Sequence, residues 1–513
     1  MYKLLAKYKN KFLYTSCVFI IIGFVALVVL NTLNNTLIDH TEGHLPTVAW
    51  LLQTDNYPLY HSIDSAKRYS LIYGPVLYLT QALFLHILSP SILAAKVPIS
   101  LALILSIFFL FLLVYKLIDL QTSVVTTTYI ILVIICFGNL YGNILFQIRS
   151  DSLILMLTCL LTLITAVKPG KSTIVAAIIT IGLCLNLKFT SIIYFLPLLY
   201  LIYNQQGISS VLVSLGGASL LSLLPFIHSQ ISLLNYLAWI KIISNHGLDF
   251  KQLEKNVVWA LYLLFPFILL IFQLYCLNIS EFKKTIVKYR DYLLLLLVSI
   301  LLISFIAAKP GSGIHHLLPF IPSILYVYIH FLKKTLFIYS NHKKKKSTSF
   351  KVNILHLMLA VIFTLTFYHG GIKGVLLWEK FNTSGSAIIA DIEKVIDRYP
   401  NTNIEMGYGE NKGYPFTYYR PILVFHGNPY LIDANVLMDM RKAGIDISNK
   451  TIEVLDSCST QIWLIPKDNQ PFAQPSYYDN SPPLFNKKFK QVFSERYQLQ
   501  DKSEFFDLWF CQE

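Results

Sequence analysis

The fold is decided by the stretch "FLYTSCVFIIIGFVALVVLNTL" (12–33) and by "IDHTEGHLPTVAW" (38–50), which follows it closely. The first is long and apolar enough to cross a bilayer as one helix. It is too long for the apolar part of a signal peptide and has no small-residue cleavage site, so we expect a retained first span. The second brings two carboxylates, Asp39 and Glu42, to the end of that span.

The composition of the whole chain is that of a membrane protein. Its 513 residues are 55% hydrophobic and 14% charged, with a mean hydropathy of +0.56, whereas soluble domains carry about 25% charged residues. The net charge of +14 is uneven, because 29 Lys/Arg accompany 11 Asp/Glu up to Lys380 and 13 accompany 17 after it. A basic excess in the membrane part marks cytoplasmic loops. No aromatic–basic recognition module accompanies the charge, which argues against nucleic acid as a partner.

The apolar segments predict a polytopic α-helical protein with about 11 transmembrane helices, at roughly 20 residues per crossing. Alternation puts the basic N-terminus, Lys116 and the clusters at 168–171, 283–290 and 333–346 on one side, which we take as the cytoplasm. An odd number of spans then places the C-terminal part outside. The expected spans are 12–33, 92–117, 121–139, 151–168, 172–187, 189–203, 208–227, 256–276, 291–308, 316–333 and 352–369.

One apolar stretch, "LIYGPVLYLTQALFLHIL" (71–88), is not counted as a span. It is barely long enough and is bracketed by Pro75 and Pro90. Counting it as a crossing would invert the later loops and move the lysine run at 343–346 outside. We therefore expect a helix in the plane of the interface, within a long outer loop at 34–91.

The membrane part, 1–379, is followed by a C-terminal part, 380–513, that is richer in Tyr, Asn, Asp and Pro. Its segment 386–400 has apolar residues at helical spacing and ends before Pro400. Three short apolar runs, "ILVFHG", "TIEVL" and "QIWLIP", have the character of buried strands. The pattern predicts a small extracytoplasmic α/β domain.

The seven cysteines divide between the two parts. Those in or beside apolar segments are expected to pack as small hydrophobic residues: Cys17, Cys136, Cys159, Cys184 and Cys276. The remaining pair, Cys458 and Cys511, lies in the C-terminal part. Because an extracytoplasmic compartment tolerates disulfides, this pair is a disulfide candidate, with the free state as the open alternative.

Acids are scarce in the membrane part, so each can be weighed. The first outer loop contains Asp39, Glu42, Asp55 and Asp64, and Asp151 opens the span 151–168 on the same side. The structural alternative is that Asp39 and Asp151 cap helices. Ionisable groups at membrane depth are candidates for a functional site, and the shared side of Asp39 and Asp151 favours that interpretation. Glu42 faces the same way as Asp39 if the segment is helical.

Chemistry on this face would need a base for an acceptor hydroxyl or amine and cations for a leaving phosphate. The available cationic and imidazole side chains are Lys67, Arg68, Arg149, Lys188, Lys309, His315 and His316. Lys188 has the alternative of snorkelling to the membrane surface. Adjacent histidines do not share one helical face, so we favour substrate contact or packing over metal binding for His315 and His316. His40 and His44 are expected at the interfacial surface.

The order and side of these motifs resemble the GT-C membrane glycosyltransferases, in particular the bacterial relatives of protein O-mannosyltransferases and lipid A aminoarabinose transferases. The resemblance covers about residues 10–335 and departs from the family in having Asp-His-Thr-Glu instead of adjacent Asp-Glu. Tyr73 opens the second of its motifs. The motifs are "TEGHLPTVAWLLQTDNYPLY" (41–60), "YGPVLYLTQALFLHILSPSILAAKVPISLAL" (73–103), "RSDSLILML" (149–157), "LKFTSIIYFLPLL" (187–199) and "GIHHLLPFIPSI" (313–324).

The resemblance implies sugar transfer from a polyprenyl-phosphate-linked donor to an envelope glycan, lipid or protein, at the outer face of a bacterial inner membrane. Asp39 would be the base or would orient the acceptor, and Glu42 would support it. Asp151 would assist, directly or through a divalent cation such as Mg²⁺ or Mn²⁺ for which Asp39 and Asp151 are the candidate ligands. The implied phosphate- and substrate-binding residues are Lys67, Arg68, Tyr73, Arg149, Lys188, His315 and His316, because a phosphate near lipid needs charge-assisted donors.

Three alternatives remain open. A transporter or lipid flippase would place ionisable or helix-breaking residues at the midplane of several spans, often in two similar halves. The interiors of the expected spans are nearly free of ionisable residues, the acids lie at their outer ends, and the chain shows no half-to-half symmetry. A polysaccharide polymerase or ligase would favour arginine-rich outer loops, and these loops are poor in arginine. A structural scaffold would leave Asp39 and Asp151 unexplained. Sugar and acceptor depend on pocket shape, which spacing does not report.

Overall fold

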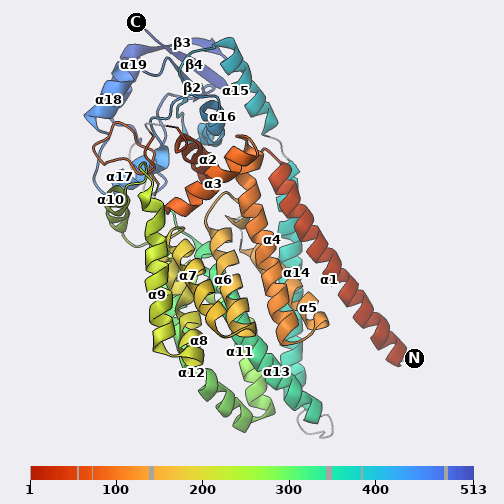
Figure 1. Ribbon diagram of the computed structural model, residues 1–513. Coiled ribbons are helices and arrows are strands. Elements are labelled where there is room, and N and C mark those ends of the chain that lie inside the picture. Colours follow the sequence, from red (N-terminus) through yellow and green to blue (C-terminus); the bar gives the residue numbers. More distant parts are fainter. Residues whose placement is uncertain are drawn as a thin grey trace.

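The structure, a computed structural model, describes residues 2–54, 57–71, 73–137, 144–342, 349–382, 385–478 and 483–512. Asp55 and the lysine run at 343–346 lie outside the described residues. Figure 1 shows a bundle of long helices in the lower half of the view and a mixed α/β part above it. The short helices α2 (His40–Leu51) and α3 (Pro75–Ile87) lie between the two.

The bundle is apolar, as the sequence predicts for a multi-pass membrane protein. Among the described residues, seven helices are long and apolar enough to cross a bilayer, so the expected total of 11 stays a prediction. Neighbouring pairs include α4 with α6, α7 with α9 and α5 with α14. The bundle helices are α1 (Tyr2–Leu33), α4 (Ile92–Leu117), α5 (Leu120–Cys136), α6 (Asp151–Val167), α7 (Lys171–Leu185), α8 (Leu196–Gln206), α9 (Ile208–Leu223), α11 (Phe250–Leu277), α12 (Ile279–Ile306), α13 (Ile321–His342) and α14 (Ser349–Asn382).

Prolines divide two of the expected spans. The segment 189–203 begins as the 3₁₀ helix η2 (Phe189–Phe195) and becomes α8 at Leu196, with Pro197 in the first turn, where its missing N–H is tolerated. The segment 316–333 likewise begins as η4 (Ile314–Phe320), which contains Pro319. Both 3₁₀ segments lie at the end of the bundle that meets the α/β part. The short turns η1 (Ile144–Phe146) and η3 (Leu224–Ile227) and the helix α10 (Leu233–Ser244) complete the membrane part.

Helix α2 starts at a capping box. The Asp39 side chain accepts from the backbone N–H of Thr41, and the Glu42 carboxylate accepts from the backbone N–H of Ile38 and of Asp39, which satisfies donors that a helix start leaves free. Gly43 lets α2 approach the α/β part, because a Cβ there would overlap the backbone of Tyr418. The residues that follow the first span thus form a short helix that packs against the C-terminal part.

A buried lysine fixes the end of the first span. Lys96 of α4 is 1% exposed, and its Nζ donates to the carbonyls of Asn31, Asn34 and Thr36 at 3.2, 2.9 and 2.8 Å. These carbonyls belong to the last turn of α1 and the residues after it, where a helix has no internal donors left. The ammonium therefore holds the chain in place just before Asp39.

The C-terminal part is built on a four-stranded sheet in the order β1-β2-β4-β3. Strands β1 and β2 are parallel, and the β2–β4 and β4–β3 pairs are antiparallel. Cys458 and Cys511 form a disulfide. The elements are α15 (Ser386–Arg398), β1 (Ile404–Met406), η6 (Asn411–Tyr419), α16 (Pro421–Phe425), α17 (Ala434–Lys442), α18 (Asn449–Asp456), β2 (Ile462–Pro466), α19 (Lys487–Arg496), β3 (Tyr497–Lys502) and β4 (Phe506–Cys511).

Two of the three strands expected from the sequence are wrong. "QIWLIP" is β2, but "ILVFHG" lies in α16 and "TIEVL" lies in α18. Helix α18 has Ser448 as its N-cap, and its buried Ile452 and Leu455 are three residues apart, a spacing that a helix places on one face. The predicted helix at 386–400 is confirmed as α15. The N-cap Ser448 is a helix signal in the sequence, but a short apolar run by itself suits a strand as well as a helix.

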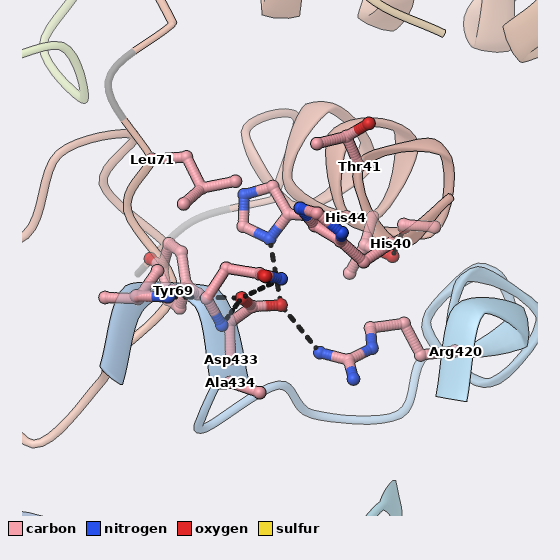
Figure 2. Close-up of polar contacts among 12 residues, drawn as sticks. His40, Thr41, His44, Tyr69, Leu71, Arg420, Asp433 and Ala434 are labelled. Carbon is pink, nitrogen blue, oxygen red and sulfur yellow. Dashed lines mark hydrogen bonds and ion pairs between the residues drawn. The ribbon is translucent and has the colours of Figure 1, made fainter. Parts of the chain in front are cut away.

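A buried ionic network joins the C-terminal part to α2 (Figure 2). Asp433 Oδ2 accepts from Arg420 Nη1 at 3.0 Å and from the Tyr430 hydroxyl at 2.7 Å, and it lies 3.3 Å from His44 Nδ1. The side chains of His44, Asp433 and Arg420 are 0, 3 and 6% exposed. The expectation that His44 lies at the interfacial surface is therefore wrong, because the C-terminal part covers this face of α2.

The backbone adds a second link between the same parts. Arg68 in the first loop forms a parallel β-bridge with Ile432. Its N–H donates to the carbonyl of Leu431 at 2.7 Å, and its carbonyl accepts from the N–H of Asp433 at 2.7 Å. Asp433 thus meets the membrane part through both its side chain and its backbone.

Removing Asp433 is expected to loosen this junction. Asp433→Ala leaves the Arg420 guanidinium buried without its carboxylate, a change that costs about 3–5 kcal/mol. Thermal unfolding of the detergent-purified protein should show a clear drop in midpoint. Asp456→Ala is the control, since its ion pair with Arg496 is about half exposed and should contribute less than about 1 kcal/mol. Equal midpoints for the two variants would contradict the proposed anchoring.

Candidate active site

A cavity of about 520 Å³ lies where the bundle meets the C-terminal part. The membrane part contributes the start of α2, the turn before α6, the residues after α7 and the loop before η4. The C-terminal part contributes one face of α17 and the segment at 477–478. Polar side chains that the sequence singled out line it, among them Tyr73, Arg149, Lys188, His315 and His316.

The first ion pair at this cavity joins Asp39 to Arg149. Arg149 Nη2 lies 2.8 Å from Asp39 Oδ1, and the two side chains are 10 and 24% exposed. Asp39 Oδ1 also accepts from the N–H and hydroxyl of Thr41 at 2.9 and 2.8 Å. Burial favours the neutral acid, but the guanidinium and the hydrogen bonds outweigh it and hold the pKa of Asp39 well below its ordinary value. Asp39 is therefore a carboxylate at neutral pH.

The second ion pair joins Asp151 to Lys188. Lys188 Nζ lies 2.9 Å from Asp151 Oδ1 and 3.4 Å from His316 Nδ1. Asp151 is the first residue of α6, where a negative charge is favoured by the helix dipole. Its Oδ2 has no hydrogen-bond partner among the described residues. The Tyr194 hydroxyl donates to the carbonyl of His316 at 2.9 Å and helps to orient this turn.

Neither Glu42 nor Asp39 lines the cavity, but Asp39 adjoins it through its contacts with Arg149 and His40. Glu42 is fully buried, and its carboxylate accepts from the backbone N–H of Ile38 at 2.5 Å and of Asp39 at 3.3 Å. Through these hydrogen bonds Glu42 can hold the backbone of Asp39 in place, and it is not positioned to contact a bound substrate. His40 is 31% exposed and lies 3.3 Å from Asp39 at the cavity wall.

The structure does not bring Lys67 and Arg68 to the cavity. Lys67 Nζ lies 3.3 Å from the centre of the Tyr57 ring, a cation–π contact. Arg68 is 1% exposed, and its Nη1 donates to the carbonyl of Lys67 at 3.0 Å. Lys309, from the loop before η4, is a cation that does line the cavity.

Three potential metal ligands come together at the cavity. Ligand atoms of Asp151, His315 and His316 lie within 4.8 Å of one another. Adjacent residues do not share one face of the 3₁₀ helix η4 either, but the imidazole rings of His315 and His316 still lie 4.4 Å apart between centroids. Two imidazoles and one carboxylate fit Zn²⁺ or Mn²⁺ better than Mg²⁺, which prefers oxygen ligands. Lys188 already provides a positive charge at the same point.

Other cavity residues were not predicted, because they come from the C-terminal part and from the loop after α10. They are His246, Asn435, Met438, Asp439, Tyr477 and Tyr478. Asn435, Met438 and Asp439 occupy positions i, i+3 and i+4 of α17 and so share one face. The sequence carries no separate signal for them, since the segment "ANVLMDMRK" has the pattern of an ordinary amphipathic helix.

The chain shares its overall fold with solved structures of ArnT. The chain is similar to the crystal structure of ArnT from Cupriavidus metallidurans bound to undecaprenyl phosphate, with a TM-score of 0.55 and 11% identity over 95% of this chain and 97% of that chain. The apo state of ArnT gives 0.51 and 9%, over 96 and 97%. The apo oligosaccharyltransferase of Archaeoglobus fulgidus gives 0.49 and 12%, over 90 and 70%. No protein-family model and no curated protein matches the chain.

The buried ion pair between Asp151 and Lys188 allows a prediction about the stability of two variants. Lys188→Met leaves the Asp151 carboxylate, 2% exposed, without its ammonium partner, and we expect a loss of about 3–5 kcal/mol. The double variant Asp151→Leu/Lys188→Met removes both charges and should unfold at a higher temperature than Lys188→Met. Thermal unfolding in detergent measures both, with the exposed Lys241→Met as control. A double variant less stable than Lys188→Met would contradict this account.

Proposed function

We propose that the protein is a glycosyltransferase that moves a sugar from a polyprenyl-phosphate-linked donor to an acceptor in the cell envelope. The observation that carries this proposal is the cavity itself, which Arg149, Lys188 and Lys309 line and where the Asp39 carboxylate is ion-paired with Arg149. A base beside a cluster of cations suits a reaction that removes a proton from one partner and releases a phosphate from the other.

The cations suit the phosphate of the donor. Arg149 Nε has no hydrogen-bond partner among the described residues, which leaves a donor for a phosphate oxygen beside the Asp39 pair. Charge-assisted bonds from arginine and lysine are the usual means of holding phosphate. The GT-C neighbour ArnT was crystallised with undecaprenyl phosphate, which supports a polyprenyl carrier here. Tyr73 lines the same cavity and can add a hydroxyl contact.

In the proposed reaction, Asp39 accepts the proton of the acceptor hydroxyl or amine, whose lone pair forms a new bond to the anomeric carbon of the sugar. The bond from that carbon to the phosphate oxygen breaks, and its electron pair leaves with the polyprenyl phosphate. A bound phosphate shares the Arg149 guanidinium, so the pKa of Asp39 rises and its carboxylate becomes a stronger base when the donor is in place. A divalent ion on Asp151, His315 and His316 would add positive charge for the leaving phosphate.

Asp39→Asn is expected to reduce sugar transfer by about 10²-fold or more, because general-base catalysis contributes about 10²–10⁴-fold. The assay uses the purified protein, radiolabelled polyprenyl-phosphate sugars and solubilised envelope acceptors. The control is Asp64→Asn, an exposed acid of the same outer loop, which should keep near-full activity. Full activity in both variants would refute the role of Asp39, and no transfer by the wild type from any lipid-linked sugar would refute the function.

We further propose that residues 1–379 form the catalytic membrane domain of a bacterial inner-membrane protein and that 380–513 form an extracytoplasmic domain. The Cys458–Cys511 disulfide supports this orientation, since disulfides persist in oxidising compartments. The basic clusters of the opposite loops support a cytoplasmic N-terminus.

The orientation is tested with reporter fusions. Alkaline phosphatase folds only outside the cytoplasm, so a fusion after Glu513 should be active. A fusion at Asn278, between α11 and α12 and next to the basic segment 283–290, should be inactive. A green fluorescent protein at the same two positions should give the reverse result. An active phosphatase at Asn278 would invert the proposed topology.

A further inference from the structure

We propose that Asp439, His246 and Tyr478 form the subsite that binds an uncharged, hydroxyl-bearing sugar unit of the acceptor. This inference rests on the proposed glycosyl transfer. It assigns the acceptor to the part of the cavity whose side chains are uncharged, as distinct from the cations that bind the donor phosphate. Asp439 lies on α17, Tyr478 lies in the segment before α19, and His246 lies in the loop between α10 and α11. All three line the cavity.

The three side chains form one polar cluster in a largely buried place. Asp439 is 6% exposed and His246 is also 6% exposed. Tyr478 is hydrogen-bonded to the Asp439 carboxyl group. His246 Nε2 lies 3.5 Å from Asp439 Oδ1 and has no hydrogen-bond partner among the described residues. A buried nitrogen that is otherwise unpaired at a cavity wall can be satisfied by a bound hydroxyl group.

The protonation of the cluster indicates which ligand it suits. Burial raises the pKa of Asp439 to about 8, and burial together with Lys309 lowers the pKa of His246 to about 4. At neutral pH the cluster is therefore a carboxylic acid, a neutral imidazole and a phenol. Each can donate or accept a hydrogen bond without carrying charge. Such groups match sugar hydroxyls, whereas the phosphate of the donor matches Arg149 and Lys188.

A route from solvent leads to this cluster. A second, more open cleft adjoins the cavity, and His246, Pro310, Tyr477 and Tyr478 line both spaces. The cleft runs between the loop at 246–251 and the C-terminal part. A polar acceptor can thus reach the cavity without crossing the bilayer core. The rings of Tyr477 and Tyr478 stand at the passage, and tyrosine combines an apolar ring face with a hydroxyl.

The loop before η4 holds Tyr478 in this position. Gly311 has φ +77°, and a Cβ at this residue would lie 2.7 Å from the Tyr478 hydroxyl. Only glycine fits both the backbone conformation and the close approach. On the other side, α17 is fixed at its N-cap Asp433 by the network with Arg420 and His44. The loop before η4 and the helix α17 therefore both support the cluster.

The test compares Tyr478→Phe and Asp439→Asn with Asp446→Asn, an exposed acid of the same part. Transfer of radiolabelled sugar is measured at increasing amounts of acceptor extract from membranes that lack the protein. Binding of undecaprenyl phosphate to the purified variants is measured in parallel. We expect each of the first two variants to raise the acceptor KM about 10-fold, the effect of losing one buried hydrogen bond, with kcat and undecaprenyl phosphate binding nearly unchanged. Asp446→Asn should match the wild type.

Each other outcome overturns a defined statement. An unchanged acceptor KM in both variants, with the wild type active, would overturn the acceptor subsite and leave the glycosyltransferase proposal standing. A loss of undecaprenyl phosphate binding together with transfer would show that the cluster only supports the fold. Absence of transfer by the wild type would overturn the proposed function and, with it, the subsite.

Discussion

The cavity depends on the anchoring of the C-terminal part by the buried carboxylate of Asp433. This carboxylate meets Arg420, Tyr430 and His44 at 2.7–3.3 Å and caps α17 through the N–H groups of Asn435 and Val436. A buried charge is tolerated only when it is paired and hydrogen-bonded. The same pairing therefore fixes the C-terminal part on α2 (Figure 2). One face of the α17 helix that Asp433 caps then lines the cavity. Without this anchoring, the cavity would lose the side that α17 lines.

The two walls of the cavity differ in charge. The membrane part supplies the cations Arg149, Lys188 and Lys309, the first two of them ion-paired with Asp39 and Asp151. The C-terminal part and the loop after α10 supply Asp439 and His246, which burial favours in their neutral forms. A transferase that joins a phosphate-linked donor to a hydroxylated acceptor needs such a division, because each substrate then finds its own partner chemistry. This asymmetry connects the proposed reaction to the proposed acceptor subsite.

Much of the membrane part could be predicted because hydropathy is a local property. The apolar runs are helices, the segment 71–88 contains the helix α3, and Asp39 and Asp151 lie at the starts of helices at the same end of the bundle. The predictions failed where local patterns were ambiguous. The short apolar runs in α16 and α18 suit either a strand or a helix, and Pro197 and Pro319 turned the ends of two spans into 3₁₀ segments.

The sequence by itself determined that this is a membrane protein and that its few acids stand beside apolar runs, because both facts follow from which residues are neighbours along the chain. Only the tertiary structure decided the partners. Asp39 pairs with Arg149, 110 residues further along the chain. Lys67 and Arg68 do not line the cavity, whereas Asp439 does, from a segment with no recognisable motif. Such pairings arise from how distant segments pack, since a buried charge takes the nearest counter-charge that the fold brings to it.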